Sequence, residues 1–129
     1  MASIFTRIVR GEIPCHRVAE DDRFLAFLDI APVSDGHTLV IPKLEVDRFF
    51  ELPDELLAGI LPFARDVARK IKTVVPCDRV GLSGVGLEVP HAHIHLLPIN
   101  GLADIGLGRP KLQRAPEQLA DLAARLRAA

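Results

Sequence analysis

The chain lacks an excess of charge of either sign. Its 129 residues include 16 Lys and Arg residues and 17 Asp and Glu residues, which gives a formal net charge of −1 at pH 7. Without a basic surplus there is no general attraction to nucleic acid or to an anionic membrane surface. We therefore expect neither as a partner, whereas local anion binding needs only a few donors aimed at one place.

Cysteines are few and long apolar runs are missing. No apolar stretch approaches the roughly 20 residues of a membrane span, and the opening residues MASIFTRIVRGE lack the apolar core of a signal peptide. Cys15 and Cys77 lie far apart and in no C-x-x-C arrangement, which is typical of small core or near-surface residues in a reducing compartment. The expected protein is soluble and cytoplasmic.

The composition, with 49% apolar and 26% charged residues, is that of a compact globular protein. We expect a single domain over residues 1–129. Short turns join the strands that precede the long helix, which favours antiparallel hairpins and an α+β fold. The apolar spacing predicts, in chain order, a short helix over 4–8, strands over 16–21, 23–29 and 37–43, a long helix over 53–75, a strand over 79–82, a histidine-rich strand, a loop over 100–115 and a helix from 116.

The long helix over 53–75 has the clearest pattern. Pro53 suits its first turn, and Pro62 is expected to kink or divide it. Its apolar stripe steps by three or four residues through Leu57, Leu61, Ala64, Ala68, Ile71 and Val75, and is widened by Ile60, Val67 and Val74.

The stretch EVPHAHIHLLP, residues 88–98, places histidines at every second position. On a strand, His91, His93 and His95 share one face, while Ala92, Ile94 and Leu96 face a core. Three neutral imidazoles on one face are hard to explain as packing, because each needs a donor and an acceptor partner. They indicate either a metal site, with His37 or Glu88 as a further ligand, or a row of catalytic groups in which one imidazole attacks an electrophile such as phosphorus.

The motif HAHIHLL resembles the signature of the histidine triad (HIT) family of nucleotide hydrolases and transferases. The likeness continues through SIFTRIVRGEIPCHRVAEDDRFLAFLDIAPVSDGHTLVIPK and covers about residues 3–98, whereas residues 99–129 are not diagnostic. It implies a HIT-like fold, with an antiparallel sheet of about five strands, one long helix, a short N-terminal helix and a C-terminal helix. It also implies a purine nucleotide substrate, no cofactor, and a homodimer in which two sheets join.

The resemblance also implies roles for individual residues. His93 is the nucleophile that forms a covalent nucleotidyl-histidine, His95 assists the leaving group, and His91 orients the catalytic ring. His37 matches the family's upstream histidine, and Asp29 matches the ribose-binding carboxylate, although from the residues alone Asp29 is equally well a turn or cap residue. The slot for the purine base is matched by Ile4, Phe5, Ile8, Phe27 and Ile30, which without the resemblance are better explained as core.

Two departures from the family pattern are expected to matter. Many bacterial relatives bind structural zinc through two cysteines, a histidine after IPK and the first triad histidine, but here the first three positions are Ser3, Thr6 and Glu45. We therefore expect no metal. Relatives also carry Gly-Gln before the triad, where this chain has Leu87 and Glu88. Leu87 cannot donate to a phosphate, Glu88 repels one or pairs with an amine leaving group, and Ser83 compensates in part.

Three functions follow from these features. The leading one is hydrolysis of purine nucleoside 5′-phosphate derivatives, with phosphoramidates as the main substrate class and dinucleoside polyphosphates as the alternative. The second is a nucleotide- or partner-binding module with weak catalysis, because Leu87 and Glu88 impair the phosphate site. The third is a metal site formed by the three triad histidines. The base, the leaving group and the physiological partner are not set by the sequence.

Overall fold

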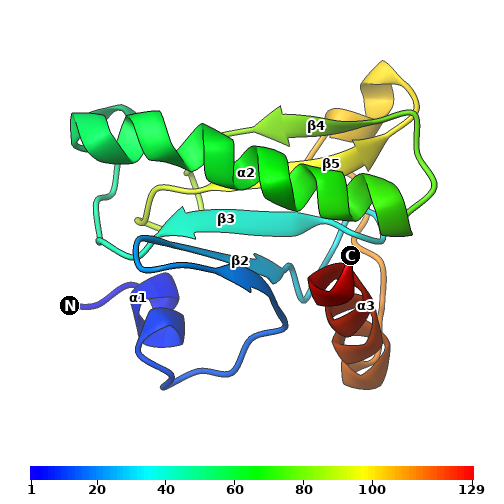
Figure 1. Cartoon of the computed structure of the whole chain (residues 1–129), viewed down its shortest axis with the longest axis horizontal. Helices are drawn as coiled ribbons and strands as arrows, with labels where there is room; N and C mark the ends of the chain where they lie inside the picture. The colour runs from blue at the N-terminus through cyan, green and yellow to red at the C-terminus, as the bar shows by residue number, and fades with distance from the viewer.

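Five antiparallel strands form one sheet in the order β1-β2-β3-β5-β4 in the computed structural model, which describes residues 1–129 (Figure 1). The strands match the expected positions within one or two residues, except for the histidine-rich one, and the α+β class is confirmed. The short helices η1 and η2 were not expected. The elements are α1 Ile4–Val9, β1 Arg17–Glu20, β2 Phe24–Leu28, β3 Thr38–Pro42, η1 Phe49–Glu51, α2 Asp54–Val74, β4 Arg79–Ser83, β5 Ile94–Ile99, η2 Leu102–Ile105 and α3 Pro116–Ala128.

Helix α2 lies along one face of the sheet (Figure 1) and is continuous through Pro62, so of the two expected effects of Pro62, a kink or a division, the division does not occur. Its buried stripe is also rotated from the predicted one, because Leu61 is 54% exposed whereas Leu56 is buried. The buried positions recur every three or four residues, as one helical face requires. They are Leu56, Ile60, Ala64, Val67 and Ile71.

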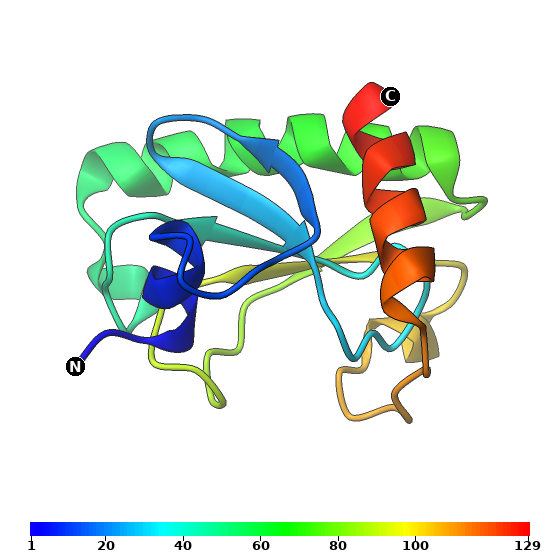
Figure 2. The ribbon, with the colours of Figure 1, turned by 90° about the horizontal axis from the view of Figure 1, so that it is seen from below.

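Helix α3 packs against β1, β2 and α2, at the edge of the sheet (Figure 2). Pro116 begins it, as expected, and Leu119, Ala123 and Leu126 join the main core between the sheet and α2. The inward-facing residues of the triad segment, Ala92, Ile94 and Leu96, lie in the same core. No helix of the structure is long and apolar enough to cross a membrane.

The short helix α1 covers only part of the opposite face of the sheet (Figure 2). The rest of that face is available for a site. Phe5 of α1 packs on this face of the sheet with apolar side chains of β2 and β3, namely Leu25, Phe27, Leu39 and Ile41. Strand β5 begins only at Ile94, so His91 and His93 precede it, and the expected histidine-rich strand is shorter than predicted. Alternation of the side chains across the sheet is nevertheless kept in this segment.

Candidate functional site

Four histidines lie on the α1 side of the sheet, where β3 and β5 run side by side. His95 lies in β5 opposite Leu39 of β3, and His37 immediately precedes β3. His37, His91 and His93 are only 1%, 0% and 5% exposed. Buried imidazoles require hydrogen-bond partners, and the partners of each ring define what the site can do.

A chain of hydrogen bonds fixes the protonation of His37 and His95. The Val33 amide donates to His37 Nδ1 (3.2 Å), so the ring proton of His37 lies on Nε2. His37 Nε2 then donates to His95 Nδ1 (2.9 Å). The proton of His95 is therefore on Nε2. The pair consequently offers an N–H donor from a neutral ring to whatever occupies the adjoining cavity.

Both rings of this pair are neutral at pH 7. Burial, together with the positive charges of Lys111 and Arg109, lowers the pKa of His37 to about 4. Burial also lowers the pKa of His95 to about 4, with contributions from the neighbouring His93 and His37. Desolvation disfavours the charged imidazolium, so His95 acts as a neutral donor over the physiological pH range.

His93 is held so that one ring nitrogen is free. Its Nδ1 donates to the carbonyl oxygen of His91 (2.6 Å), which places the ring proton on Nδ1 and the lone pair on Nε2. The ring of Phe5 meets it edge-on at 5.1 Å between centroids, and the ring of His95 lies at 4.9 Å. A neutral imidazole with an unpaired Nε2 beside an N–H donor is suited to nucleophilic attack.

His91 has a structural environment. Its Nε2 donates to the carbonyl oxygen of Pro42 (2.8 Å), and its Nδ1 accepts from Ser3 Oγ (2.8 Å). Because both nitrogens are bonded outside the cavity, the three triad rings do not converge on one ion. The geometry therefore argues against the metal site at the triad and agrees with a positioning role for His91.

Ser3, Thr6, Glu45 and His91 come together as a hydrogen-bonded group. Glu45 Oε1 accepts from the Ser3 amide (2.7 Å) and from Thr6 Oγ1 (2.6 Å), while Ser3 Oγ caps α1 by accepting from the Thr6 amide (3.0 Å). Two hydroxyls and a carboxylate that satisfy one another, without a thiolate, do not fit a structural zinc ion. This network instead fastens α1 to the segment after β3.

The Glu45 carboxylate makes the network sensitive to acid. Hydrogen bonds from Thr6 and from the Ser3 amide lower the pKa of Glu45 to about 2. Because the pKa in the folded state lies below the ordinary 4.5, this stabilisation is complete above pH 4.5 and is lost as the pH falls towards 2. We expect the urea midpoint of Glu45→Gln to fall less than that of the wild type between pH 6 and pH 3. Glu51→Gln, at an exposed glutamate, is the control, and equal falls in all three proteins would refute the assignment.

A cavity of about 210 Å³ is lined by five of the residues that the sequence analysis assigned to the site, namely Asp29, His37, Glu88, His93 and His95. Asp29 Oδ1 accepts from the Ala31 amide (2.9 Å), so one oxygen serves the turn, and Oδ2 lies 3.7 Å from His37 Nε2. The turn role of Asp29 is therefore seen directly, and its role as the ribose-binding carboxylate stays a prediction. The remaining lining residues are Val85, Gly86, Leu87, Leu107, Gly108 and Lys111.

Asp29, His37 and His95 also place their ligand atoms within 4.8 Å of one another. The facing nitrogens of His37 and His95 already share a proton, and Lys111 lines the same cavity. A cation would have to displace that proton and approach a like charge. These features favour an anionic ligand over a metal ion.

The residues expected to hold the base divide into two groups. Phe5 and Phe27 are buried and meet edge-on at 5.6 Å between centroids, and Ile8 packs against their cluster. Ile4 and Ile30 are 50% and 71% exposed. The first group is core, as the residues alone suggest, and the second group presents apolar surface to solvent. Outside this set, Ser83 pairs with His95 in the sheet register but does not line the cavity.

The cavity residues that the sequence interpretation did not name are Val85 and Gly86, just before the triad, and a second group, Leu107, Gly108 and Lys111. This second group comes from the loop after η2, which has no periodic pattern. Contacts with residues 32–35 bring this loop to the site, and no local signal in the sequence predicts such long-range contacts.

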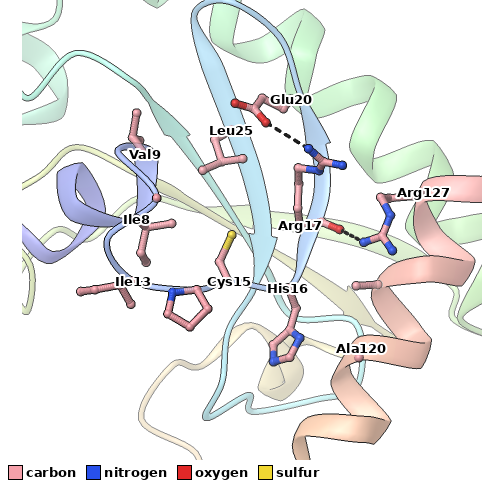
Figure 3. A pocket seen from close by; sticks show the side chains of 13 residues that line it. Ile8, Val9, Ile13, Cys15, His16, Arg17, Glu20, Leu25, Ala120 and Arg127 are labelled. Carbon is pink, nitrogen blue, oxygen red and sulfur yellow. Dashed lines mark hydrogen bonds and ion pairs between the residues drawn. The ribbon is translucent and has the colours of Figure 1, made fainter.

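A larger cavity of about 570 Å³ lies elsewhere, between α1, the segment that leads into β1, and α3. Figure 3 shows Ile8 and Val9 on one side, Ala120 and Arg127 on the other, and Cys15 between them. Burial raises the pKa of the Cys15 thiol, which makes it less reactive. None of the four histidines lines this cavity, so its size does not mark it as the reactive site.

Comparison with known proteins agrees with this geometry. Adenosine 5′-monophosphoramidase hnt1 of Schizosaccharomyces pombe is 41% identical over 124 residues, covering 92% of this chain and 91% of that protein. A Hit-like protein involved in cell-cycle regulation from Bartonella henselae superposes with a TM-score of 0.83 at 30% identity, covering 98% of this chain and 95% of that one. A Zn-bound histidine triad family protein from Mycobacterium smegmatis gives 0.82 at 30% identity, with 99% and 92% covered.

The sequence model of the HIT domain matches residues 10–101. This range contains all four histidines of the site. The sheet, the helices and the structural likeness confirm the expected HIT-like fold. The chain belongs to the HIT family.

Proposed function

We propose that this protein hydrolyses purine nucleoside 5′-phosphate derivatives at the α-phosphate, with phosphoramidates as the main substrates. The observation that carries the proposal is the free Nε2 of His93 beside the N–H of neutral His95. The adenosine 5′-monophosphoramidase of fission yeast, 41% identical, supports the substrate class. No metal or cofactor enters this scheme.

The reaction proceeds in two displacements. His93 Nε2 attacks the α-phosphorus, the bond from phosphorus to the leaving nitrogen breaks, and the amine departs with a proton taken from water, while the neutral His95 Nε2–H donates a hydrogen bond to the departing group or to a phosphoryl oxygen. Water then attacks the same phosphorus, the phosphorus–Nε2 bond breaks, and the proton that this water releases to solvent replaces the one that the amine took up. The products are a nucleoside 5′-monophosphate and an amine, and both histidines regain their starting state.

Three further groups support binding in this scheme. Asp29 lines the cavity, and its Oδ2, which does not serve the turn, accepts from the ribose hydroxyls. Ile4 and Ile30, which are exposed, offer apolar contacts for the base. Dinucleoside polyphosphates follow the same chemistry with a phosphate as leaving group, and are the alternative substrates.

A nucleotide-binding module with weak catalysis is the second candidate. Leu87, 88% exposed, and the Glu88 carboxylate both line the cavity, where a phosphate prefers donors. The two functions separate when AMP binding is measured by calorimetry and release of AMP from adenosine 5′-phosphoramidate is measured by chromatography. Steady release of AMP supports the enzyme, and tight AMP binding without product over hours supports the module.

We also propose a cytoplasmic homodimer. The free cysteines Cys15 and Cys77 agree with a reducing compartment. Strand β4 has a neighbour on one side only, and an uncovered strand edge invites a second strand. Leu82 on β4 and Leu61 on α2 are 50% and 54% exposed, which is apolar surface that a partner copy would cover.

The dimer is tested by light scattering coupled to size-exclusion chromatography. We expect twice the 14.1 kDa chain mass for the wild type. The double substitution Leu61→Lys with Leu82→Lys should shift the protein towards the monomer, because it buries charge in the contact. The control is Leu102→Lys, at a residue 93% exposed on η2. A wild-type mass of one chain would refute the dimer.

A further inference from the structure

We propose that Lys111 binds the α-phosphate of the substrate and thereby replaces the donors that the segment before the triad lacks. This inference rests on the proposed function and adds a residue from the variable C-terminal part of the chain. Lys111 lies outside the matched HIT domain, residues 10–101, yet it lines the same cavity as His93 and His95.

The loop that carries Lys111 is fastened to residues 32–35. The Leu112 amide donates to the carbonyl oxygen of Pro32 (2.7 Å), and Arg114 makes two hydrogen bonds with Asp35, at 2.8 and 3.1 Å. The adjacent Val33 amide is the donor that fixes the tautomer of His37. The same short turn therefore positions both Lys111 and the pair of neutral histidines.

The side chain of Lys111 is held near the cavity and remains accessible. Its Nζ donates to the carbonyl oxygen of Leu107, at 2.9 Å, and Leu107 lines the cavity too. One hydrogen bond to a carbonyl leaves two ammonium protons for an anion. Arg109 has no such freedom, because its guanidinium donates to the carbonyl oxygens of Asp104, Gly106 and Val33.

The balance of charge in the cavity calls for a cation at this position. Lys111 is the one Lys or Arg among the lining residues, and Asp29 and Glu88 are the acidic ones. The neutral His37 and His95 add no positive charge, and the side chain of Leu87 offers no donor. Without Lys111, an anionic phosphate would enter a cavity that carries two carboxylates, and like charges repel. The effect of Lys111 on His37 and His95, whose pKa values its charge lowers, agrees with its closeness to the reacting groups.

The test compares ligands with and without a phosphate. AMP and adenosine are titrated by calorimetry into the wild type, Lys111→Ala and Lys111→Arg. We expect Lys111→Ala to bind AMP about 10- to 100-fold more weakly, as for loss of a hydrogen bond to a charged group, and to bind adenosine as the wild type does. Lys111→Arg should restore most of the AMP affinity because it keeps the charge.

Lys72→Ala is the matched control, because Lys72 also donates from Nζ to loop carbonyl oxygens, those of Cys77 and Asp78, but lies outside the cavity. It should bind both ligands normally. Wild-type affinity of Lys111→Ala for AMP, or equal weakening for AMP and adenosine, would overturn the inference while the hydrolase proposal stands. Failure of the wild type to bind AMP would overturn the inference, whereas the hydrolase proposal falls only if adenosine 5′-phosphoramidate releases no AMP.

Discussion

Replacing His93 by glycine is expected to lower the turnover of adenosine 5′-phosphoramidate by a factor of about 10³ or more. The reason is geometric, because the His93 Nε2 lone pair is left free when Nδ1 bonds to the carbonyl oxygen of His91. No other histidine in the cavity has a free lone pair, since His37 and His95 both present protons on Nε2. The measurement is AMP released per enzyme under saturating substrate.

Two controls separate a nucleophile from a packing residue. His93→Gly leaves a space the size of the lost ring, so added imidazole should enter it and restore part of the turnover. AMP binding by calorimetry should stay within a few-fold of the wild type. His16→Ala, at a histidine that lines the larger cavity, should leave turnover unchanged. Full activity of His93→Gly without imidazole would remove the proposed mechanism.

The sequence predicts that the triad histidines share one face of the sheet, because successive side chains of an extended segment point to opposite faces. Ala92, Ile94 and Leu96 are buried in the core as that rule predicts, and His93 and His95 share the cavity on the other side. The rule does not reveal that His91 bonds to Ser3, since that contact spans 88 residues. The family resemblance assigned the positions of Ser3 and His91 to one site, but only as positions at which relatives bind zinc.

Other parts of the molecule depend on packing that no local pattern encodes. Leu61 fits the apolar spacing of α2 yet is exposed, because the helix turns its Leu56–Ile60–Ala64 face to the sheet. Lys111 reaches the cavity through contacts with the turn near Pro32, and these contacts depend on how a loop without periodicity folds back. The positions of such residues depend on tertiary contacts, so the sequence alone predicts the row of histidines better than the groups that surround it.

His37→Leu is expected to lower the turnover number by roughly 10²-fold, although His37 need not touch the substrate. His37 Nε2–H donates to His95 Nδ1, and this bond holds the proton of His95 on the side that faces the cavity. Leucine cannot donate, so His95 is free to place its proton on Nδ1 and to present a lone pair where a donor is needed. AMP affinity should change much less than the turnover number, because the nucleotide contacts proposed for Asp29 and Lys111 remain.

His37→Gln separates this effect from a loss of stability. Both substitutions remove the acceptor of the Val33 amide, and an unpaired buried donor costs about 1–3 kcal/mol, so both variants should unfold at a lower urea concentration. The Gln side-chain amide, however, can still donate to His95 Nδ1 and should recover at least about 10-fold of the lost turnover. Equal turnover in the Leu and Gln variants would mean that His37 only supports the fold, and that the tautomer of His95 is set by another group.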